Sequence, residues 1–596
     1  MKYVLAVSLV LILSAKLLSS GEPMSAIDWI SKSSRPDVIQ SIEPDIINET
    51  TTSDDSVVLK SYLGTVSLNS IGIIPAESLE LPRNIWSDSN EMELVRLLEN
   101  LPILKFHAGN MFLRKLLIAE TSSPFRNNDD GSFLVQRLES LTNLGALEEV
   151  ETILNLANPE SGELLRIWGD NSFLIGRIGR FCSKVISLSN IVIEKEIRIL
   201  CLANRNQWQN AALVLSSAIA LDKIELTERE LLLLYLEPEY TSSLDFQKID
   251  NLTPFTFYLR DIVGIPTNTS ELQKKYDFKE LTNEYDFKRR VAAKFKFIKS
   301  GILSFDHILD ELPPSYFARV SVGKLGLNNY NQSINFNSTY EAKIFQKFIL
   351  RLSHEFEDVN LLIPLLKFFA NDIVNAYQKN PVYEMNELFI ISYLLGTNWV
   401  PIENMNINKH SDLLISKIIK SKALTKEIIN NEDICDNFCK SVSQSLLQKD
   451  TDKYRYRNPP QTKKAGEKIL ESLALISEAE NAEVNNISKG FNLLIEAGQT
   501  TIAEKFAVEF LVRRHLEKKS DERLKLKKMI ESYKQGISTS TFEVNVTEHN
   551  KIEEAVQGFT KLLDGKYNRI QFGGKDFVIK GRLKPNKFSL ELKHDF

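Results

Sequence analysis

Histidine is scarce in this chain, and the sequence motifs of several enzyme classes are missing. The 596 residues include seven histidines, each isolated from the others in the sequence. No G-x-x-x-x-G-K-[ST], G-x-S-x-G or H-E-x-x-H pattern is present; these patterns hold phosphate, expose a nucleophilic serine or bind zinc. The acidic segment HEFED at 354–358 lacks a second histidine at helical spacing, so we interpret it as a solvated helix face. We therefore predict no enzymatic activity, no metal site and no cofactor.

An excess of charge of one sign is also lacking. The chain has 73 basic and 78 acidic residues, for a formal net charge of −5. Proteins that bind nucleic acid neutralise phosphates with clustered lysine and arginine, and they are usually basic. We expect no nucleic-acid partner.

Long apolar runs are absent beyond the N-terminus. No later stretch approaches the roughly 18 uninterrupted apolar residues of a membrane-spanning helix. Residues 1–21 combine Lys2, an apolar run from Val4 to Leu13 and small residues at 19–21, which is the layout of a cleaved secretory signal. We expect cleavage between Ser19 and Glu22 and a soluble periplasmic chain. The alternative is an uncleaved N-terminal anchor.

Cysteine is rare, with four residues in the whole chain. Cys182 and Cys201 fall on two successive predicted helices, so a helical hairpin would bring them together as a disulfide in an oxidising compartment. Cys435 and Cys439 lie four residues apart in ICDNFCK and form a second candidate pair, the alternative being two buried thiols. A structural zinc site needs four ligands, and neither cysteine pair has further Cys or His residues nearby to supply them.

Helical periodicity dominates from about Trp86 to Tyr533. Three segments each combine an apolar helix end, a polar or glycine turn and a second helix with small residues: Arg137–Ala157, Ile199–Ala218 and Phe491–Leu511. Hairpins of this kind cannot bury their apolar stripes alone, and they stack into solenoids. We predict a mainly α fold, a tetratricopeptide-like α-solenoid of helical hairpins with a short C-terminal β-hairpin-like segment. The alternative is an irregular all-α bundle.

The second of these segments carries the most specific packing prediction. Trp208, Ala211, Ala212 and Leu215 follow the i, i+3, i+4, i+7 spacing of a helix with one buried face. We predict that Trp208 is a packing anchor at the turn and that Ala211, Ala212 and Leu215 form the inner stripe. The alternative is an exposed tryptophan that stacks on a ligand.

Changes in composition divide the chain into regions. The Asn-rich segment 324–340 and the Pro-containing segment 448–468 predict breaks between helical blocks. Beyond Gly536, alternating apolar residues and the turn pairs Gly573-Gly574 and Pro585-Asn586 predict two or three antiparallel strands. The predicted organisation is a signal peptide (1–21), an extended or disordered tether (22–84), helical blocks at 85–323, 341–447 and 464–535, and a small β-rich basic tail (550–596).

Two basic segments lie near the C-terminus. We interpret Val512–Gln535 either as a solvated capping helix or as a contact with an anionic surface, such as lipid headgroups or cell-wall polymer. From Lys566 to Phe596 there are eight basic and three acidic residues, a local charge of +5. This tail would either add a strand to a partner or cover the end of the helical stack.

Several stretches resemble a group of uncharacterised proteins of alphaproteobacteria that are predicted to be periplasmic. They are SAIDWI (Ser25–Ile30), VSLNSIGIIPAESLELPRNIW (Val66–Trp86) and the alanine-bearing hairpins, with EAGQTTIAEKFAVEFLV as a later match. The resemblance is best from Ser25 to about Val263. It implies a periplasmic location and a helical body, and it implies no activity. The chain departs from the group in its richness in Asn, Ile and Lys and in its basic tail.

These features predict a non-enzymatic periplasmic scaffold or adaptor that binds protein partners in the bacterial cell envelope. One alternative is a binding protein or enzyme associated with peptidoglycan, resembling the superhelical part of a lytic transglycosylase. Such enzymes need a general-acid carboxyl in a closed pocket, and the chain ends in a β-like segment where their catalytic domain would be expected. A secreted eukaryotic glycoprotein is a third interpretation, prompted by sequons at Asn48 and Asn251.

Overall fold

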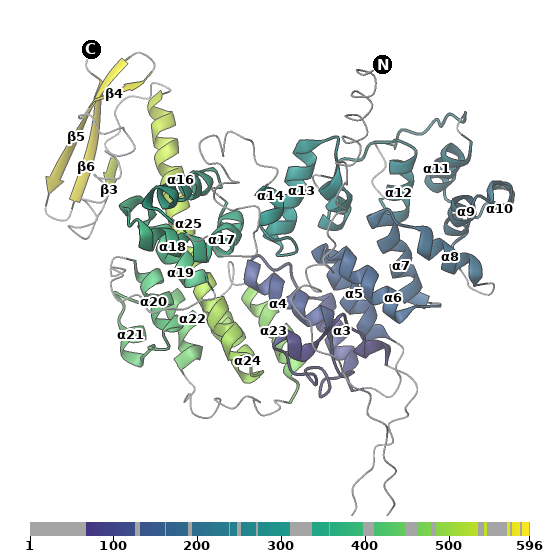
Figure 1. The fold of residues 1–596 in the computed structure, drawn as a ribbon, viewed down its shortest axis with the longest axis horizontal. Helices are drawn as coiled ribbons and strands as arrows, with labels where there is room; N and C mark the ends of the chain where they lie inside the picture. Colours follow the sequence, from purple (N-terminus) through teal and green to yellow (C-terminus); the bar gives the residue numbers. More distant parts are fainter. Residues whose placement is uncertain are drawn as a thin grey trace, which may run out of the picture. The chain divides into compact units, whose positions relative to one another are not determined.

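The structure, a computed structural model, is mainly helical, as the periodicity predicts (Figure 1). It describes residues 67–125, 131–160, 162–188, 193–237, 239–246, 252–269, 272–309, 336–356, 358–396, 410–447, 463–477, 484–534, 542–544, 569–572, 575–584 and 587–594. The predicted signal peptide, residues 22–66 of the predicted tether, both sequons' asparagines, and residues 324–335 and 448–462 of the two predicted breaks lie outside these ranges.

The chain forms two compact units that interleave along the sequence. Unit 1 comprises residues 1–315 and 440–506, and unit 2 comprises residues 316–439 and 507–596. The three predicted helical blocks therefore do not coincide with the units, because the block at 464–535 is divided between them.

Unit 1 holds the N-terminal helices and a shorter C-terminal set. The N-terminal elements are η1 (Leu68–Ser70), β1 (Ile74–Pro75), η2 (Ala76–Leu79), α3 (Glu91–Glu99), α4 (His107–Ile118), β2 (Ala119–Glu120), α5 (Ser132–Leu144), α6 (Leu147–Ala157), α7 (Gly162–Ile175), α8 (Gly179–Ser187), α9 (Lys195–Asn204), α10 (Trp208–Ala220), α11 (Leu226–Leu236), α12 (Pro254–Ile262), η4 (Lys274–Thr282), α13 (Phe287–Lys299) and α14 (Asp306–Leu309). The C-terminal elements are most of α22 (Asn437–Leu447), α23 (Ala465–Ser477), α24 (Val484–Glu496) and the start of α25 (Thr500–Lys534).

The three predicted hairpins share one way of ending the first helix. Gly145, Asn206 and Gly498 follow α5, α9 and α24 with φ of 89°, 60° and 78°. In each case the next N–H donates to a carbonyl five residues back at 2.9 Å, which is the closure of a Schellman motif. The pairs α5–α6 and α9–α10 then pack together, whereas α24 packs against α23.

The end of the predicted tether is part of the folded body. Asn69, Ala76 and Leu81 are buried, and β1 pairs in parallel with β2. Residues 67–84 therefore do not form a free tether, because their apolar side chains and backbone groups are used in packing against α4 and α5.

A C-terminal helix of unit 1 packs on its N-terminal part. α23 contacts α3, the N–H of Gly466 donates to the carbonyl of Ile85 at 3.0 Å, and Glu467 accepts from the N–H of Asn90 at 3.1 Å. The indole of Trp86 fills the space beside Gly466, and it is fully buried. Glycine is required at 466 because a Cβ there would lie 2.2 Å from Cε3 of Trp86.

We expect Gly466→Ala to lower the free energy of unfolding of unit 1 by about 3 kcal/mol, since overfilling a packed core forces side chains or backbone to move. The thermal midpoint measured by circular dichroism checks this. Gly179→Ala is the matched control, because a Cβ at Gly179 meets nothing within 4 Å. Equal midpoints for the two variants would contradict the packing of α23 on Trp86.

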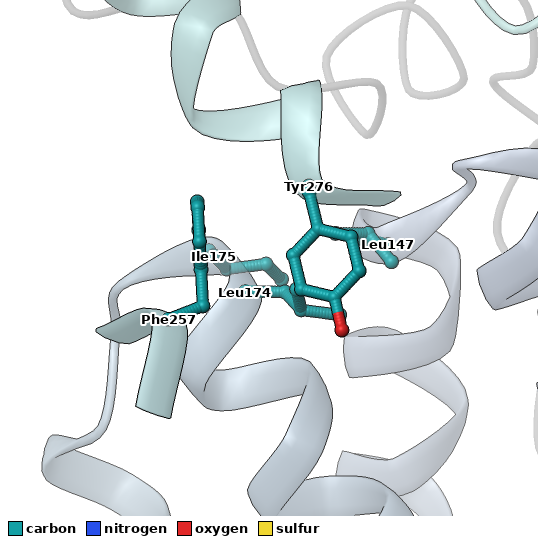
Figure 2. Close-up of a cluster of buried hydrophobic side chains, with 5 residues drawn as sticks. All are labelled: Leu147, Leu174, Ile175, Phe257 and Tyr276. Carbon is teal, nitrogen blue, oxygen red and sulfur yellow. The ribbon is translucent and has the colours of Figure 1, made fainter. Parts of the chain in front are cut away.

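A second cluster joins the middle helices of unit 1. Figure 2 shows Leu147 of α6, Leu174 and Ile175 of α7, Phe257 of α12 and Tyr276 of η4 converging on one point. The hydroxyl of Tyr276 donates to the carbonyl of Leu252 at 2.9 Å, so its polar end is satisfied while its ring stays in the core. This cluster fixes α12 against α7.

Unit 2 contains helices and a C-terminal sheet. Its elements are α16 (Thr339–Glu355), α17 (Val359–Phe368), α18 (Ala370–Lys379), η5 (Tyr383–Met385), α19 (Asn386–Leu395), α20 (Ser411–Lys420), α21 (Lys426–Asn430), the first residues of α22, the rest of α25, and the strands β3 (Phe542–Val544), β4 (Arg569–Phe572), β5 (Lys575–Lys584) and β6 (Lys587–His594). The strands form an antiparallel sheet in the order β3-β6-β5-β4, with Ile579 opposite Leu592. β4, β5 and β6 occupy the region where the sequence predicts strands.

Within the described ranges, no single helix is long and apolar enough to cross a bilayer. One pair, α17 and α18, reaches the required length and hydropathy only jointly, and it bends by 67° between the two helices.

Candidate functional site

Both predicted cysteine pairs are disulfides in the structure. Cys182 of α8 and Cys201 of α9 have Cα atoms 4.8 Å apart, and Cys435 and Cys439 have Cα atoms 5.2 Å apart. All four cysteines are buried. The first bridge ties the two helices that precede α10, joining α8 to the C-terminal half of α9.

The prediction for Trp208 is wrong. The side chain is 44% exposed, and its ring lies 5.6 Å from that of Tyr235, centroid to centroid. Trp208 is the first residue of α10, so the helix has no preceding turn over which the indole can pack. Ala212 is also exposed, which contradicts its place in the inner stripe.

The inner stripe of α10 is narrower than predicted. It consists of Ala211, Leu215 and Ala218, all buried, at the i, i+4, i+7 spacing of one helix face. Ala212 lies about 100° further around the helix. α10 packs on α9 and α11, and these two neighbours cover only one side of it.

We now expect Trp208→Ala to lower the thermal midpoint only slightly, at a cost of about 1 kcal/mol or less, because a half-exposed ring loses little on truncation. Trp168→Ala is the matched control. That indole is 4% exposed, packs 6.2 Å from Phe181 and donates to Glu151 at 3.3 Å. Its truncation should cost about 3–5 kcal/mol. Equal losses would restore the packing-anchor interpretation of Trp208.

A group of carboxylates meets where α9 and α11 begin. Glu194 and Glu225 are the N-cap residues of α9 and α11, and Glu196 and Glu228 stand in the first turns of these helices. The partial positive charge of a helix N-terminus favours acidic residues at these positions. In the described part of the chain none of the four makes a hydrogen bond or ion pair through its carboxylate.

The electrostatics of Glu228 are unusual. Burial, together with the charges of Glu196, Glu225 and Glu194, raises the pKa of Glu228 to about 7. Every charge that acts on this carboxylate is negative. The repulsion is therefore uncompensated within the described residues, and a cation brought to this place would be stabilised.

Two tyrosines extend this surface along α11 and α12. Tyr235 lies seven residues after Glu228, on the same face of α11. Burial, Tyr235 and Asp261 raise the pKa of Tyr258 to about 12, so its hydroxyl remains protonated at neutral pH. We call Glu194, Glu196, Glu225, Glu228, Tyr235 and Tyr258 the carboxylate–tyrosine surface. α11 packs against both α9 and α12, so it lies between the helices that carry the other residues of this surface (Figure 1).

Asp170 is a further carboxylate near this surface, and unlike the four glutamates it has basic neighbours. Burial raises its pKa to about 6, against the opposing charges of Arg166 and Lys275. The Arg166 guanidinium contacts Asp170 at 2.6 Å. Unlike Glu228, Asp170 is therefore already paired, and it contributes less to any attraction for an external cation.

No group of three or more His, Cys, Asp or Glu in the described ranges is placed to hold a metal ion. What the surface offers is negative charge next to aromatic rings, which attracts cations through both Coulombic and cation–π interactions.

The basic stretch Val512–Gln535 is partly used inside unit 2. Arg514 contacts Asp436 at 2.7 Å, Lys518 contacts Asp412 at 2.8 Å, and Nε2 of His515 lies 2.7 Å from Glu387. The pKa of Glu387 is lowered to about 2. Burial alone would raise this pKa, but the hydrogen bond with His515 and the charge of Lys519 outweigh the effect of burial. Arg514 and Lys518 are therefore paired with carboxylates of unit 2, while the Lys518 side chain stays 50% exposed.

The four glutamates and two tyrosines of the carboxylate–tyrosine surface were not singled out from the sequence. The signal that could have found the glutamates is the acidic runs E-K-E at 194–196 and E-L-T-E at 225–228, each at the start of a helix. Comparison with known proteins adds no assignment to these residues. No family model matches the chain, and no curated protein or solved structure matches it either.

Proposed function

We propose that the protein is a non-enzymatic scaffold of the bacterial cell envelope, exported to the periplasm, that binds a lysine- or arginine-rich segment of a protein partner at the carboxylate–tyrosine surface. The observation that carries this proposal is the meeting of four glutamates at the starts of α9 and α11, none of them paired within the described residues. Burial and the other three carboxylates raise the pKa of Glu228 to about 7. A partner's cations would remove that repulsion. The long side-chain stems of lysine and arginine would lie along the ring of Tyr235, since the ring of Tyr258 already has the ammonium of Lys279 over it, 6.0 Å from its centroid.

The architecture supports the scaffold role. The packed pairs α5–α6 and α9–α10 are closed by the same type of turn, as expected of a tetratricopeptide-like array of hairpins. Arrays of this kind present several helices side by side to an extended partner. The two disulfides are consistent with the periplasm, which is oxidising, and so are the residues that resemble predicted periplasmic proteins.

A pH-dependent binding experiment tests the proposal. The probe is a fluorescent helical peptide of lysine and alanine, and its counterpart has glutamate in place of lysine. Since Glu228 ionises near pH 7, affinity for the lysine peptide should rise about tenfold between pH 6 and pH 8. Glu228→Gln should bind weakly at both pH values. Glu99→Gln, an exposed substitution on α3, should behave as wild type.

Two results would overturn this function. Equal affinity for the lysine and glutamate peptides, or equal binding by wild type and Glu228→Gln at pH 8, would remove the carboxylates from recognition. Cosedimentation of wild type with purified peptidoglycan, unchanged in Glu228→Gln, would favour the cell-wall alternative. Capture from native envelope with wild type and Glu228→Gln side by side then identifies the partner that depends on this residue.

A further inference from the structure

A pocket of about 480 Å³, open to solvent, lies where α6, α7 and α8 meet in unit 1. The side chains that line it are two cations, two hydroxyls, an amide and an indole: Arg180, Lys184, Ser183, Ser187, Asn155 and Trp168. No carboxylate is among its described lining residues; Glu151, which accepts from the indole of Trp168 at 3.3 Å, lies outside the lining. Small-molecule sites typically have volumes of about 300–1,000 Å³, so the pocket has the size of such a site.

The placement of Arg180 in this pocket is unfavourable without an anion nearby. It stands in the first turn of α8, which holds no acidic residue and where the helix dipole disfavours a cation. Lys184 follows four residues later, so two like charges are neighbours on one helix face. Within the described residues the Arg180 side chain has no hydrogen bond or ion pair, and it is exposed. Its guanidinium is therefore available to a ligand.

Two further cations lie at the same pocket. Lys184 donates to Glu160 at 3.1 Å, and the Glu160 side chain is 70% exposed, so a ligand can compete with it for the ammonium. Arg205, the C-cap residue of α9, donates to the hydroxyl of Ser183 at 2.8 Å and has no ion pair within the described part of the chain. Three cations therefore surround the pocket, with one exchangeable carboxylate among them.

We propose that this pocket binds a small phosphorylated sugar or polyol, with Arg180 and Lys184 on its phosphate group and Arg205 beside them. A phosphate monoester carries a charge of about −2 at neutral pH and three strong acceptor oxygens. The planar fork of a guanidinium matches two of these oxygens. The charge and the donors of the pocket therefore fit a phosphate group better than a neutral ligand.

The hydroxyls of the pocket favour a ligand that carries hydroxyl groups of its own. Ser183 and Ser187 donate their hydroxyl protons to the carbonyls of Gly179 and Lys184, at 2.8 and 2.7 Å. Their oxygens keep lone pairs, and that of Ser187 accepts from no described group. It can accept from a sugar or polyol O–H. The site uses none of the residues of the carboxylate–tyrosine surface, so the inference does not depend on the partner proposed above.

Calorimetric titration of the full chain tests the ligand class. The probes are glucose 6-phosphate and glycerol 3-phosphate, with inorganic phosphate and glucose for comparison. At least one phosphorylated probe should bind about tenfold more tightly than inorganic phosphate or glucose, because it alone presents both kinds of group. No binding of either phosphorylated probe at millimolar concentration, or equal affinity for inorganic phosphate, would overturn the inference.

Three variants then test the residues. Arg180→Gln should weaken binding about tenfold or more, since a charge-assisted contact is lost, and its thermal midpoint should equal that of wild type. Glu160→Gln should bind more tightly, because Lys184 loses its competing carboxylate. Arg198→Gln, the same change at an exposed position of α9 outside the pocket lining, is the matched control and should bind as wild type. Equal affinities of Arg180→Gln and Arg198→Gln would contradict the site.

Chemical footprinting locates the ligand without any variant. Phenylglyoxal modifies exposed guanidinium groups, and peptide mass mapping reads the extent of modification at each arginine. Arg180 and Arg198 are both exposed, so both should react in the free protein. The phosphorylated probe that binds most tightly should slow the modification of Arg180 several-fold and leave that of Arg198 unchanged. Equal rates at Arg180 with and without this probe would overturn the proposed contact.

Discussion

Replacing Arg137 by methionine is expected to lower the free energy of unfolding of unit 1 by about 4 kcal/mol, because buried acceptors left without donors cost about 1–3 kcal/mol each. Arg137 is fully buried. Its guanidinium donates to the carbonyls of Leu117 (2.6 and 3.1 Å), Asn69 (3.1 Å) and Ala119 (3.0 Å). Methionine fills a similar volume but donates nothing, so three buried carbonyls lose their partner.

The charge of Arg137 is retained in this site. Burial lowers its pKa to about 10, which leaves the guanidinium protonated at neutral pH. Two of its acceptors lie at the C-terminal end of α4, where the helix dipole is negative. The third belongs to η1, so one side chain joins the 67–84 segment to the helical body.

Native-state hydrogen exchange of α4 and α5 measures the effect without requiring a two-state transition, which a chain of two units need not show. Arg166→Met is the matched control: that guanidinium is 42% exposed and pairs with surface carboxylates, and such pairs contribute about 1 kcal/mol or less. Arg137→Lys should give an intermediate loss. A loss in Arg137→Met as small as that in Arg166→Met would show that the carbonyls find other donors.

Arg137 also illustrates what the sequence could not predict. It opens the segment Arg137–Ala157, where a charged residue before an apolar helix suggests solvent exposure. Its burial follows from backbone acceptors contributed by η1, α4 and β2. The local sequence pattern does not predict such acceptors. Every residue has a backbone carbonyl, and the tertiary fold determines which buried carbonyls lack a backbone donor.

Local patterns nevertheless predicted a good deal of the fold. The turns at Gly145, Asn206 and Gly498 follow from residues that tolerate positive φ. The Cys182–Cys201 bridge follows from two cysteines on successive helices. The interleaved units escaped prediction because they depend on contacts such as that of Asn90 with Glu467, 377 residues apart. Periodicity shows which side of a helix is apolar, but it does not show how many neighbouring helices cover that side. The predicted burial of Trp208 and Ala212 was wrong for this reason.

Removing the Cys182–Cys201 disulfide is expected to cost about 3 kcal/mol, from the chain entropy regained by a loop of about 20 residues in the unfolded state. The bridge spans 19 positions, whereas Cys435–Cys439 spans four. The same relation gives about 2 kcal/mol for the shorter loop. Thermal unfolding of the two double alanine variants, each compared with wild type, should therefore rank Cys182→Ala/Cys201→Ala as the less stable.

The first bridge also bears on the carboxylate–tyrosine surface, because α9 begins with Glu194 and Glu196. Loss of the covalent link between α8 and the C-terminal half of α9 should increase amide exchange in α9 and weaken binding of the lysine peptide. The Cys435→Ala/Cys439→Ala variant changes unit 2 and should leave that binding unchanged. If both variants bind the peptide like wild type while only stability falls, the disulfide stabilises the hairpin without positioning the carboxylates. If neither variant loses stability, the α8–α9 hairpin is already held by packing around Phe181, whose ring lies 5.8 Å from Phe173, and the entropic argument fails for this loop.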